Sequence, residues 1–406
     1  MYNVPDIRFR LYEENWERKA WADVVDISKN MVDPLSGAFD NLPHIGPGNI
    51  ESFTGMLIDN IKSVGEEKLI SGKFYFDKGD IVYGKINPHL AKYVIPDFNG
   101  LASADAYILN AKNGLEQLFL FYILQTKAFY NYTVSVSQRT GMPKINRDEL
   151  SQYKFLAPSI DEQAAIGNFF HILSENIALH KNKLDKLKKL KKAYLQKMFP
   201  KEGENVPIIR FVWFTEPWGT QKLGDIAPLR YGFPFKSEKF QASGVPIIRI
   251  TNIDSSGIVG GEFVHYKAQL QDERFSLHNN AILIAMSGAT TGKVAILNCP
   301  TKQKFYQNQR VGYFTSTKKT DYNFIAVLVH SNSFASQLKS ALVAGAQPNI
   351  SSKEIDSFMI CIPNCVEEHM EMGKFFLKLD GLIAAQQDKL TSLQQLKVAL
   401  LQRMLV

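Results

Sequence analysis

The chain of 406 residues has only three cysteines and no run of the ~18 consecutive apolar residues that a membrane-spanning helix needs. Its N-terminal residues are charged from Asp6 onward and lack the apolar centre of a secretory signal. A sparse, odd number of cysteines excludes a disulfide framework and is typical of a reducing compartment. These absences predict a cytoplasmic protein without a membrane partner.

The cysteines give one weak hint of a metal site, because Cys361, Cys365 and His369 follow one another at intervals of four residues. A tetrahedral zinc site needs a fourth ligand, and Pro363 disfavours one continuous helix through this segment. We therefore expect structural cysteines and no metal.

The net charge of +7 invites a nucleic-acid interpretation, but most of this charge is local. Residues 181–201 hold nine lysines and one acid, Asp185, so the rest of the chain is close to neutral. A lysine run on a long helix is usually its solvated face and identifies no recognition surface. The apolar fraction of 45% and the 27 phenylalanines are sufficient for folded cores, and the length predicts two or three compact units.

The strongest signal is an internal repeat. Residues 4–23 recur as 206–225 with eight identities at an offset of 202, and residues 167–199 align with 373–405 without a gap. In the second pair 15 of 33 positions are identical, whereas chance would give about two. A period of this length is too long for a solenoid and indicates two copies of a domain followed by a helix.

The repeated ends are predicted to be long helices bounded by Pro158, Pro200 and Pro363. Apolar residues share one face in each copy: Ile177, Leu184, Leu187, Leu190, Tyr194, Leu195 and Met198 in the first, and Ile383, Leu390, Leu393, Leu396, Leu400, Leu401 and Met404 in the second. Each stripe is roughly 140° wide, which is wider than a two-stranded seam. We expect the helices to pair with each other and with a partner outside the chain.

Between the repeated ends the halves differ and are predicted to be mixed α/β. Residues 78–80 predict a turn that leads into a short strand at 81–83, and residues 281–284 predict its equivalent in the second half. Residues 115–132 and 323–342 are expected to form short helices.

Two segments resemble catalytic signatures but depart from them. Residues 287–293 resemble a nucleotide-binding loop, yet only three residues separate Gly288 from Gly292, and Val294 replaces the Ser or Thr that would bind magnesium. Residues 87–90 resemble an amino-methyltransferase signature without its second proline and its aromatic residue. We therefore expect no catalysis and no bound cofactor.

The order of motifs, repeated in both halves, resembles the specificity subunits of type I restriction–modification enzymes over essentially the whole chain. Residues 79–88 and 287–293 are similar to a sequence motif found early in that family's recognition domains. Residues 141–146 and 345–351 are similar to the segment at the end of these domains. Pro158, Glu162-Gln163 and Ile166 resemble the entry to the family's helix, where the second copy has Glu367-Glu368.

The resemblance implies an α+β (mixed α/β) fold in which two target-recognition domains are joined by two long conserved helices forming an antiparallel coiled coil, with a pseudo-twofold internal repeat. It divides the chain into a recognition domain at 1–158, a spacer helix at 159–200, a second recognition domain at 201–362 and a second spacer helix at 363–406.

The same resemblance implies the partners. Each domain would read one half of a bipartite target in double-stranded DNA, with the spacing set by the helices. Two modification subunits would dock on the helices, and restriction subunits would join that complex. S-adenosylmethionine, ATP and Mg²⁺ are expected on these partners, and the isolated chain is expected to self-associate through its helix faces.

Residues that contact bases should be polar side chains of the variable parts, because Arg or Lys pairs with guanine and Asn or Gln with adenine, assisted by hydroxyls. The candidates are Lys85, Asn87, Gln138, Arg139, Thr140 and Lys144 in the first domain, and Thr290, Thr291, Lys293, Gln307, Asn308, Gln309 and Arg310 in the second. The alternative for each is an ordinary turn or surface residue.

Two other functions stay open. A stand-alone DNA methyltransferase or nuclease would act without partner subunits, although the motifs it requires are missing. A structural coiled-coil adaptor would bind no DNA, and it would give no reason for domains that diverge while their helices agree.

Overall fold

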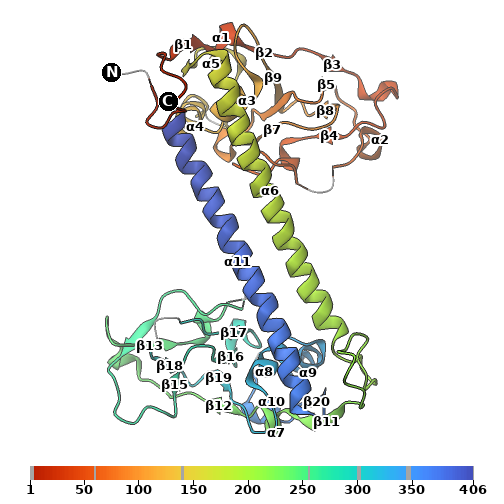
Figure 1. Cartoon of the computed structure of the whole chain (residues 1–406), viewed down its shortest axis with the longest axis vertical. Coiled ribbons are helices and arrows are strands. Elements are labelled where there is room, and N and C mark those ends of the chain that lie inside the picture. The colour runs from red at the N-terminus through yellow and green to blue at the C-terminus, as the bar shows by residue number, and fades with distance from the viewer. Residues whose placement is uncertain are drawn as a thin grey trace. The chain divides into compact units, whose positions relative to one another are not determined.

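The computed structural model describes residues 4–58, 61–138, 141–254, 257–299, 303–343 and 349–405, and it divides into two compact units (Figure 1). Unit 1 holds Met1–Lys181 together with Asp388–Val406, and unit 2 holds Asn182–Gln387. The C-terminal end of the chain therefore belongs to the same unit as the N-terminal domain. Each unit combines one mixed α/β domain with parts of both long helices.

The domain of unit 1 consists of short strands and helices. Its strands are β1 (Glu17–Ala20), β2 (Val25–Ile27), β3 (Met31–Val32), β4 (His44–Ile45), β5 (Lys73–Phe76), β6 (Ile81–Gly84), β7 (Tyr93–Val94), β8 (Gly100–Ala102), β9 (Ala106–Ala111) and β10 (Lys154–Ala157). Its helices are α1 (Trp21–Val24), α2 (Val64–Glu67), α3 (Gln117–Ile123), α4 (Lys127–Val136) and α5 (Arg147–Ser151). Strand β1 pairs antiparallel with β10, so the domain closes where it began, just before the long helix.

The domain of unit 2 closes in the same way, through the antiparallel pair β11–β20. Its strands are β11 (Gly219–Lys222), β12 (Leu229–Tyr231), β13 (Val245–Ile248), β14 (Val264–Tyr266), β15 (Ser276–Leu277), β16 (Ile282–Ala285), β17 (Val294–Ile296), β18 (Phe305–Gln307), β19 (Val311–Phe314) and β20 (Met359–Ile362). Its helices are α7 (Leu223–Ile226), α8 (Tyr322–Leu328), α9 (Asn332–Val343) and α10 (Ser352–Asp356).

One four-stranded sheet has the same topology in both units. Its order is β2-β9-β6-β7 in unit 1 and β12-β19-β16-β17 in unit 2, with antiparallel neighbours throughout. Strands β6 and β16 are buried along their whole length. A short, continuous apolar run suits a strand covered on both faces, and the strands predicted at these two places are confirmed.

The other four-stranded sheet differs between the units at one edge. Its order is β3-β5-β8-β4 in unit 1 and β14-β13-β18-β15 in unit 2. The parallel pair β4–β8 corresponds to the parallel pair β13–β18, and the antiparallel pair β5–β8 to β15–β18. The fourth strand is β3 beside β5 in unit 1 but β14 beside β13 in unit 2. The two domains thus share a framework and diverge at its periphery.

The long helices are α6 (Ile160–Lys197) and α11 (Val366–Met404). Unit 1 combines the beginning of α6 with the end of α11, and unit 2 combines the end of α6 with the beginning of α11, so the helices run antiparallel. Within unit 2, the ammonium group of Lys191 on α6 forms an ion pair with Asp380 on α11. The antiparallel helix pair expected from the family resemblance is confirmed.

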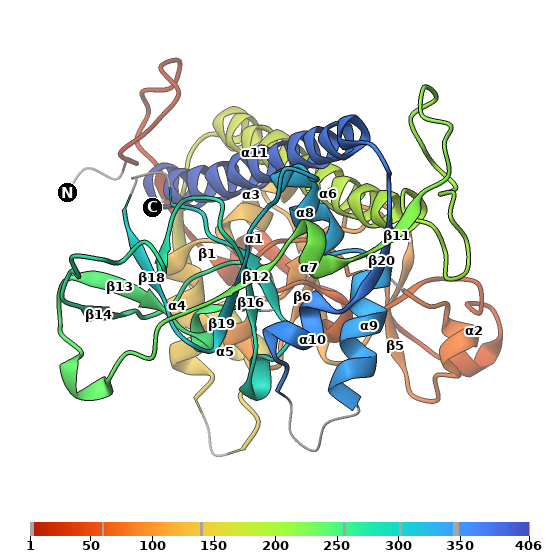
Figure 2. The same cartoon turned by 90° about the horizontal axis from the view of Figure 1, so that it is seen from below.

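The helix ends are parts of the domain cores. In unit 1, Phe170 of α6 and Leu401 and Met404 of α11 share a cluster with Trp16 and Phe119. In unit 2, α8 lies between the central sheet and the start of α11 (Figure 2), and Phe324 and Val327 of α8 cluster with Phe376 of α11 and Ile284 of β16. Each domain is therefore fixed to both helices by its hydrophobic core.

An ion pair with a buried carboxylate connects the first residues of each domain to its long helix. Arg8 donates from Nε and Nη2 to the carboxylate of Glu162, both at 2.7 Å, and Arg210 donates in the same way to Glu368, both at 2.8 Å. Glu162 is 0% exposed and Glu368 1%. The counterpart of Glu162 is therefore Glu368 alone, which refines the comparison of Glu162-Gln163 with Glu367-Glu368.

His369 consequently occupies the position of Gln163. Its Nε2 lies 3.0 Å from the carbonyl oxygen of Pro363, as Nε2 of Gln163 lies 2.9 Å from that of Pro158, and its Nδ1 contacts the hydroxyl of Thr320. Both ring nitrogens are thus used in the core. Among the described residues there is no group of three His, Cys, Asp or Glu side chains placed to hold a metal ion.

The segments 115–132 and 323–342 each contain two helices. The hydroxyl of Thr126 accepts from the amide of Phe129 and starts α4, and the hydroxyl of Ser331 accepts from the amide of Phe334 near the start of α9. A side-chain cap of this kind begins a new helix where the previous one ends. Within the described part of the chain no helix is long and apolar enough to cross a bilayer.

Candidate nucleic-acid interface

In unit 1 three segments meet beyond the end of strand β6. The amide of Lys85 donates to the carbonyl of Asp105 at 3.0 Å, and the amide of Ile145 donates to the carbonyl of Lys85 at 3.0 Å. The amide of Asn87 donates to the carbonyl of Pro143 at 2.8 Å. We call this arrangement of the loop after β6, the β8–β9 turn and the segment before α5 the loop frame.

Unit 2 repeats the loop frame. The amide of Met286 donates to the carbonyl of Arg310 at 2.9 Å, and the amide of Ile350 donates to the carbonyl of Met286 at 2.9 Å. Ser287 forms a bridge to Asn349, as Ile86 does to Lys144 in unit 1. The early motif and the closing motif of each recognition domain therefore meet, in each unit, at one end of the shared sheet.

In unit 1 the frame carries three of the predicted residues. The ammonium of Lys85 lies 5.2 Å from the centre of the Tyr107 ring. Burial lowers the pKa of Lys85, and the negative charge of Asp105 offsets part of this effect. Asn87 has a left-handed backbone (φ 50°) before the short 3₁₀ helix Pro88–Leu90. Lys144 is exposed beside them. The backbone thus brings these three residues together.

The other candidates of unit 1 lie on the segment after α4. Gln138 is exposed there, and no described contact brings it to the frame. Arg139 and Thr140 lie outside the described residues, so their assignment stays a prediction.

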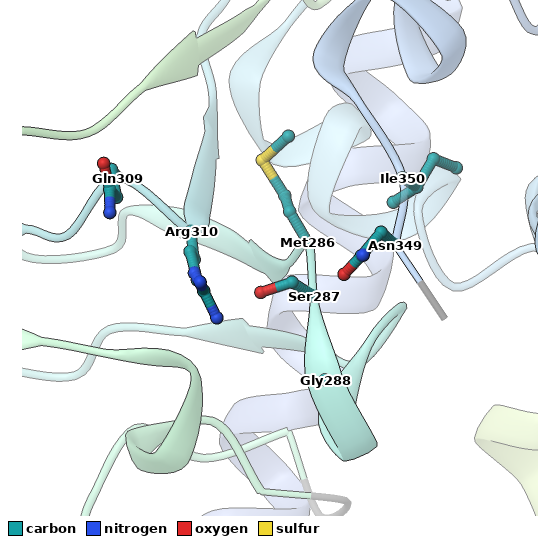
Figure 3. A pocket seen from close by; sticks show the side chains of 7 residues that line it. All are labelled: Met286, Ser287, Gly288, Gln309, Arg310, Asn349 and Ile350. Atoms are coloured by element: carbon teal, nitrogen blue, oxygen red, sulfur yellow. The ribbon is translucent and has the colours of Figure 1, made fainter. Parts of the chain in front are cut away.

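In unit 2 the frame surrounds a cavity of about 480 Å³ (Figure 3). It is lined by Met286, Ser287, Gly288, Gln309, Arg310, Asn349 and Ile350. The side chains of Ser287 and Asn349 point toward the side on which Arg310 extends, whereas Gln309 lies farther away. Arg310 and Gln309 are exposed, and Ser287 Oγ is buried without a hydrogen-bond partner among the described residues.

The remaining candidates of unit 2 do not line this cavity, and three of them have side chains engaged in hydrogen bonds. Thr290 donates to the carbonyl of Ile250 at 3.1 Å, and Thr291 donates to that of Gly288 at 2.6 Å. Asn308 accepts from the amide of Arg310 at 3.2 Å. These contacts shape the loops. Lys293, also half-buried, lies at the other end of the turn.

Gln307 does not fit the prediction of a DNA contact. It is 0% exposed, and its amide donates to the carbonyls of Arg230 and Val311 at 2.8 and 2.7 Å. The side chain satisfies two buried carbonyl groups inside the sheet, so we withdraw it from the candidates.

The residues predicted from the sequence do not include Asp105, Ser287 or Asn349. Ser287 and Asn349 stand in the motifs that carry the family resemblance, but Asp105 stands in none of them. Asp105 would have been found by comparing the halves, because the offset of 205 that relates α3 to α8 also relates Asp105 to Arg310.

The predicted interface residues of the helices differ in exposure. Ile177, Leu184, Met198, Leu390 and Met404 are buried, and Leu187, Tyr194, Ile383, Leu393 and Leu400 are half-buried. Leu190 and Leu396, which are equivalent in the repeat, are 44% and 48% exposed. The stripes therefore face the fold for most of their width and solvent at one repeated position.

The loop frames present hydrogen-bond donors and acceptors on a fixed backbone. Such side chains suit the reading of base edges. The family model "Type I restriction modification DNA specificity domain" matches residues 13–189 and again 215–395. The two matches correspond to the two copies of the repeat.

Curated relatives are similar to parts of the chain. The EcoDI specificity subunit of Escherichia coli is 35% identical over 152 residues, which are 37% of this chain and 33% of that protein. The MjaVIII specificity subunit of Methanocaldococcus jannaschii is 25% identical over 309 residues, covering 73% of this chain and 72% of the relative.

Solved structures share the fold. The type I restriction–modification S subunit from M. genitalium superposes with a TM-score of 0.66 at 14% identity and 99% coverage of both chains. A chain from a study of assembly of the type I R-M system gives 0.52 at 16% identity, with 95% and 96% coverage. Together with the two family-model matches, these similarities show that this chain belongs to the specificity subunits of type I restriction–modification systems.

Proposed function

We propose that each unit reads one half of a bipartite target in double-stranded DNA. The observation that carries this proposal is the loop frame, which has the same backbone hydrogen bonds in both units but different side chains. Lys85, Asn87 and Lys144 stand in one frame where Met286, Gly288 and Asn349 stand in the other. One scaffold with two different sets of side chains would recognise two different half-sites.

The long helices would set the spacing of the two half-sites and dock two modification subunits. Leu190 and Leu396 support this role, because an exposed leucine recurs at the same position of both helices. Two copies of one partner would find equivalent surfaces related by the repeat. The isolated chain, with these leucines uncovered, would self-associate at micromolar concentrations, as light scattering can test.

Specificity subunits are the non-catalytic component of these systems. Methyl transfer with S-adenosylmethionine, and ATP- and Mg²⁺-dependent restriction, would take place on the partner subunits in the cytoplasm. The chain itself would recognise the target sequence in the DNA.

The test is co-expression with a modification subunit, followed by single-molecule sequencing of N6-methyladenine in the host DNA. Methylation at one split motif with two unlike halves supports the proposal, and exchange of either recognition domain should change only one half. If an assembled complex gives no such motif, the proposal is overturned and the adaptor interpretation is favoured.

Docking can be tested with the double variant Leu190→Asp, Leu396→Asp. Because both leucines are about half exposed, a carboxylate there should leave the chain folded and abolish co-purification with the modification subunit. Leu270→Asp is the matched control, since Leu270 is fully exposed and lies outside the helices. Normal assembly of the double variant would contradict docking at this surface.

A further inference from the structure

Asp105 and Arg310 occupy the same backbone position in the two recognition domains. The carbonyl of Asp105 accepts from the amide of Lys85, and the carbonyl of Arg310 accepts from that of Met286. The amide of Asp105 donates to the hydroxyl of Ser103, as that of Arg310 donates to the side chain of Asn308, both at 3.2 Å.

The turns that carry the two residues are closed by matching bonds. The backbone amide of Ser103 donates to the carbonyl of Ile45 at 2.9 Å, and the backbone amide of Asn308 donates to the carbonyl of Ile248 at 3.1 Å. Ser103 follows β8, which pairs in parallel with β4, the strand of Ile45. Asn308 follows β18, which pairs in parallel with β13, the strand of Ile248. The equivalence of Asp105 and Arg310 therefore rests on pairing in both sheets.

Arg310 is placed to contact a ligand. Its side chain is exposed and extends beside the cavity of about 480 Å³, and it makes no hydrogen bond or ion pair with another described residue (Figure 3). Opposite it, the buried hydroxyl of Ser287 lacks a partner among the described residues. A guanidinium with five donors at a cavity that already contains an unsatisfied hydroxyl suits a flat, acceptor-rich edge.

Asp105 offers the opposite chemistry at this position. Its carboxylate is exposed and can only accept when ionised. Lys85 lies next to it, since the amide of Lys85 donates to the carbonyl of Asp105, and Lys144 lies on the segment that bridges to Ile86. The first unit thus presents an acceptor where the second presents a donor.

We propose that Arg310 reads a guanine in the half-site of unit 2, and that Asp105 reads the N4 amino group of a cytosine at the equivalent step of the half-site of unit 1. Arginine donates two parallel hydrogen bonds to guanine O6 and N7, whereas a carboxylate accepts from cytosine N4. The inference rests on the proposed function and adds the base identity to it.

The experiment compares the DNA motifs that are methylated by complexes containing the wild-type chain, the Arg310→Gln variant or the Asp105→Asn variant. Because glutamine pairs with adenine, Arg310→Gln should reduce the preference for guanine at one position of one half-site roughly 5- to 150-fold and leave the other half unchanged. Asp105→Asn should relax one position of the other half only. Lys319→Gln and Asp97→Asn are the matched controls, because both residues are exposed and lie at the opposite end of the strands.

Binding of the assembled complex gives a second readout if a variant methylates too slowly. A duplex with 7-deazaguanine at the assigned position lacks N7. The wild-type complex should bind this duplex more weakly than the normal duplex, whereas the Arg310→Gln complex should bind the two duplexes equally well. If the Arg310→Gln complex methylates the same motif as the wild type and loses as much affinity with 7-deazaguanine, the inference is overturned but the proposed function is not. A wild-type complex that methylates no split motif would overturn the proposed function as well.

Discussion

The ammonium nitrogen of Lys397 lies 5.4 Å from the centre of the Tyr122 ring in unit 1. Lys397 is 8% exposed, and no carboxylate among the described residues pairs with it. Its counterpart in the repeat, Lys191, is paired with Asp380. The residue equivalent to Asp380 is Ser174, whose hydroxyl lies 3.1 Å from that of Tyr122. The two ends of the helix pair thus differ by one carboxylate.

Replacement of Lys397 by methionine should stabilise unit 1 in a pH-dependent way. Burial lowers the pKa of Lys397 from 10.5 to about 8, so between these values the unfolded chain holds more protons than the folded chain. The penalty for the buried charge, up to about 3 kcal/mol, is complete below about pH 8 and disappears toward pH 10.5.

Thermal unfolding at about pH 7 and about pH 10 tests this expectation. Lys397→Met should raise the midpoint at the lower pH and have less effect at the higher. The exposed Lys389, mutated to Met, is the control and should show no such difference. A gain that is independent of pH would contradict the assigned cause.

Ser174→Asp should restore the missing ion pair. A carboxylate at the position equivalent to Asp380 would favour the charged form of Lys397 and raise its pKa. NMR titration of labelled lysines would detect the change, with Ser174→Asn as the uncharged control. If Lys397 titrates at the same pH in Ser174→Asp, the two helix positions are not equivalent in space.

Glu368→Gln should destabilise unit 2 by about 3 kcal/mol, the lower end for a buried pair, because it removes the buried carboxylate that pairs with Arg210, whose side chain is 11% exposed. Glu162→Gln should cost less, since Glu368 also accepts from Nε1 of Trp218 at 3.2 Å whereas Nε1 of Trp16 has no partner among the described residues.

Hydrogen exchange at the amides of Ile209 and Ile7 measures these effects locally, because these amides bond to the carbonyls of Lys197 and Arg403. Glu371→Gln is the control, as its ion pair with Lys374 is exposed and should contribute less than about 1 kcal/mol. Equal effects of Glu162→Gln and Glu368→Gln would argue against a role for the Trp218 bond.

Cleavage of the backbone in the exposed segment 201–205 should leave the protein assembled. Each fragment contributes to both units, since α6 begins in unit 1 and ends in unit 2 while α11 does the reverse. Met198 and Phe199 hold one cut end in the core of unit 2. Size-exclusion chromatography should therefore show one peak that contains both fragments, and separation without denaturant would contradict this.

The sequence alone determined the repeat, the two long helices and the family, because these depend on local signals. The apolar stripe from Ile177 to Met198 has the period of a helix, and Pro158 and Pro200 bound it. The buried strands at Ile81 and Ile282 were equally visible, since a short apolar run between turn residues needs no knowledge of its neighbours.

Only the tertiary structure decided which polar residues reach the surface of the loop frame. Gln307 and Gln309 are equally plausible DNA contacts when only the sequence is known. Pairing of β18 with β13 buries the side chain of Gln307 in the core and leaves that of Gln309 exposed. Likewise, Asp105 meets Lys85 only because β8 and β9 return to the end of β6. Register in a sheet is fixed by partners distant in the chain, so the side chains that a domain offers to DNA are a property of the assembled sheet.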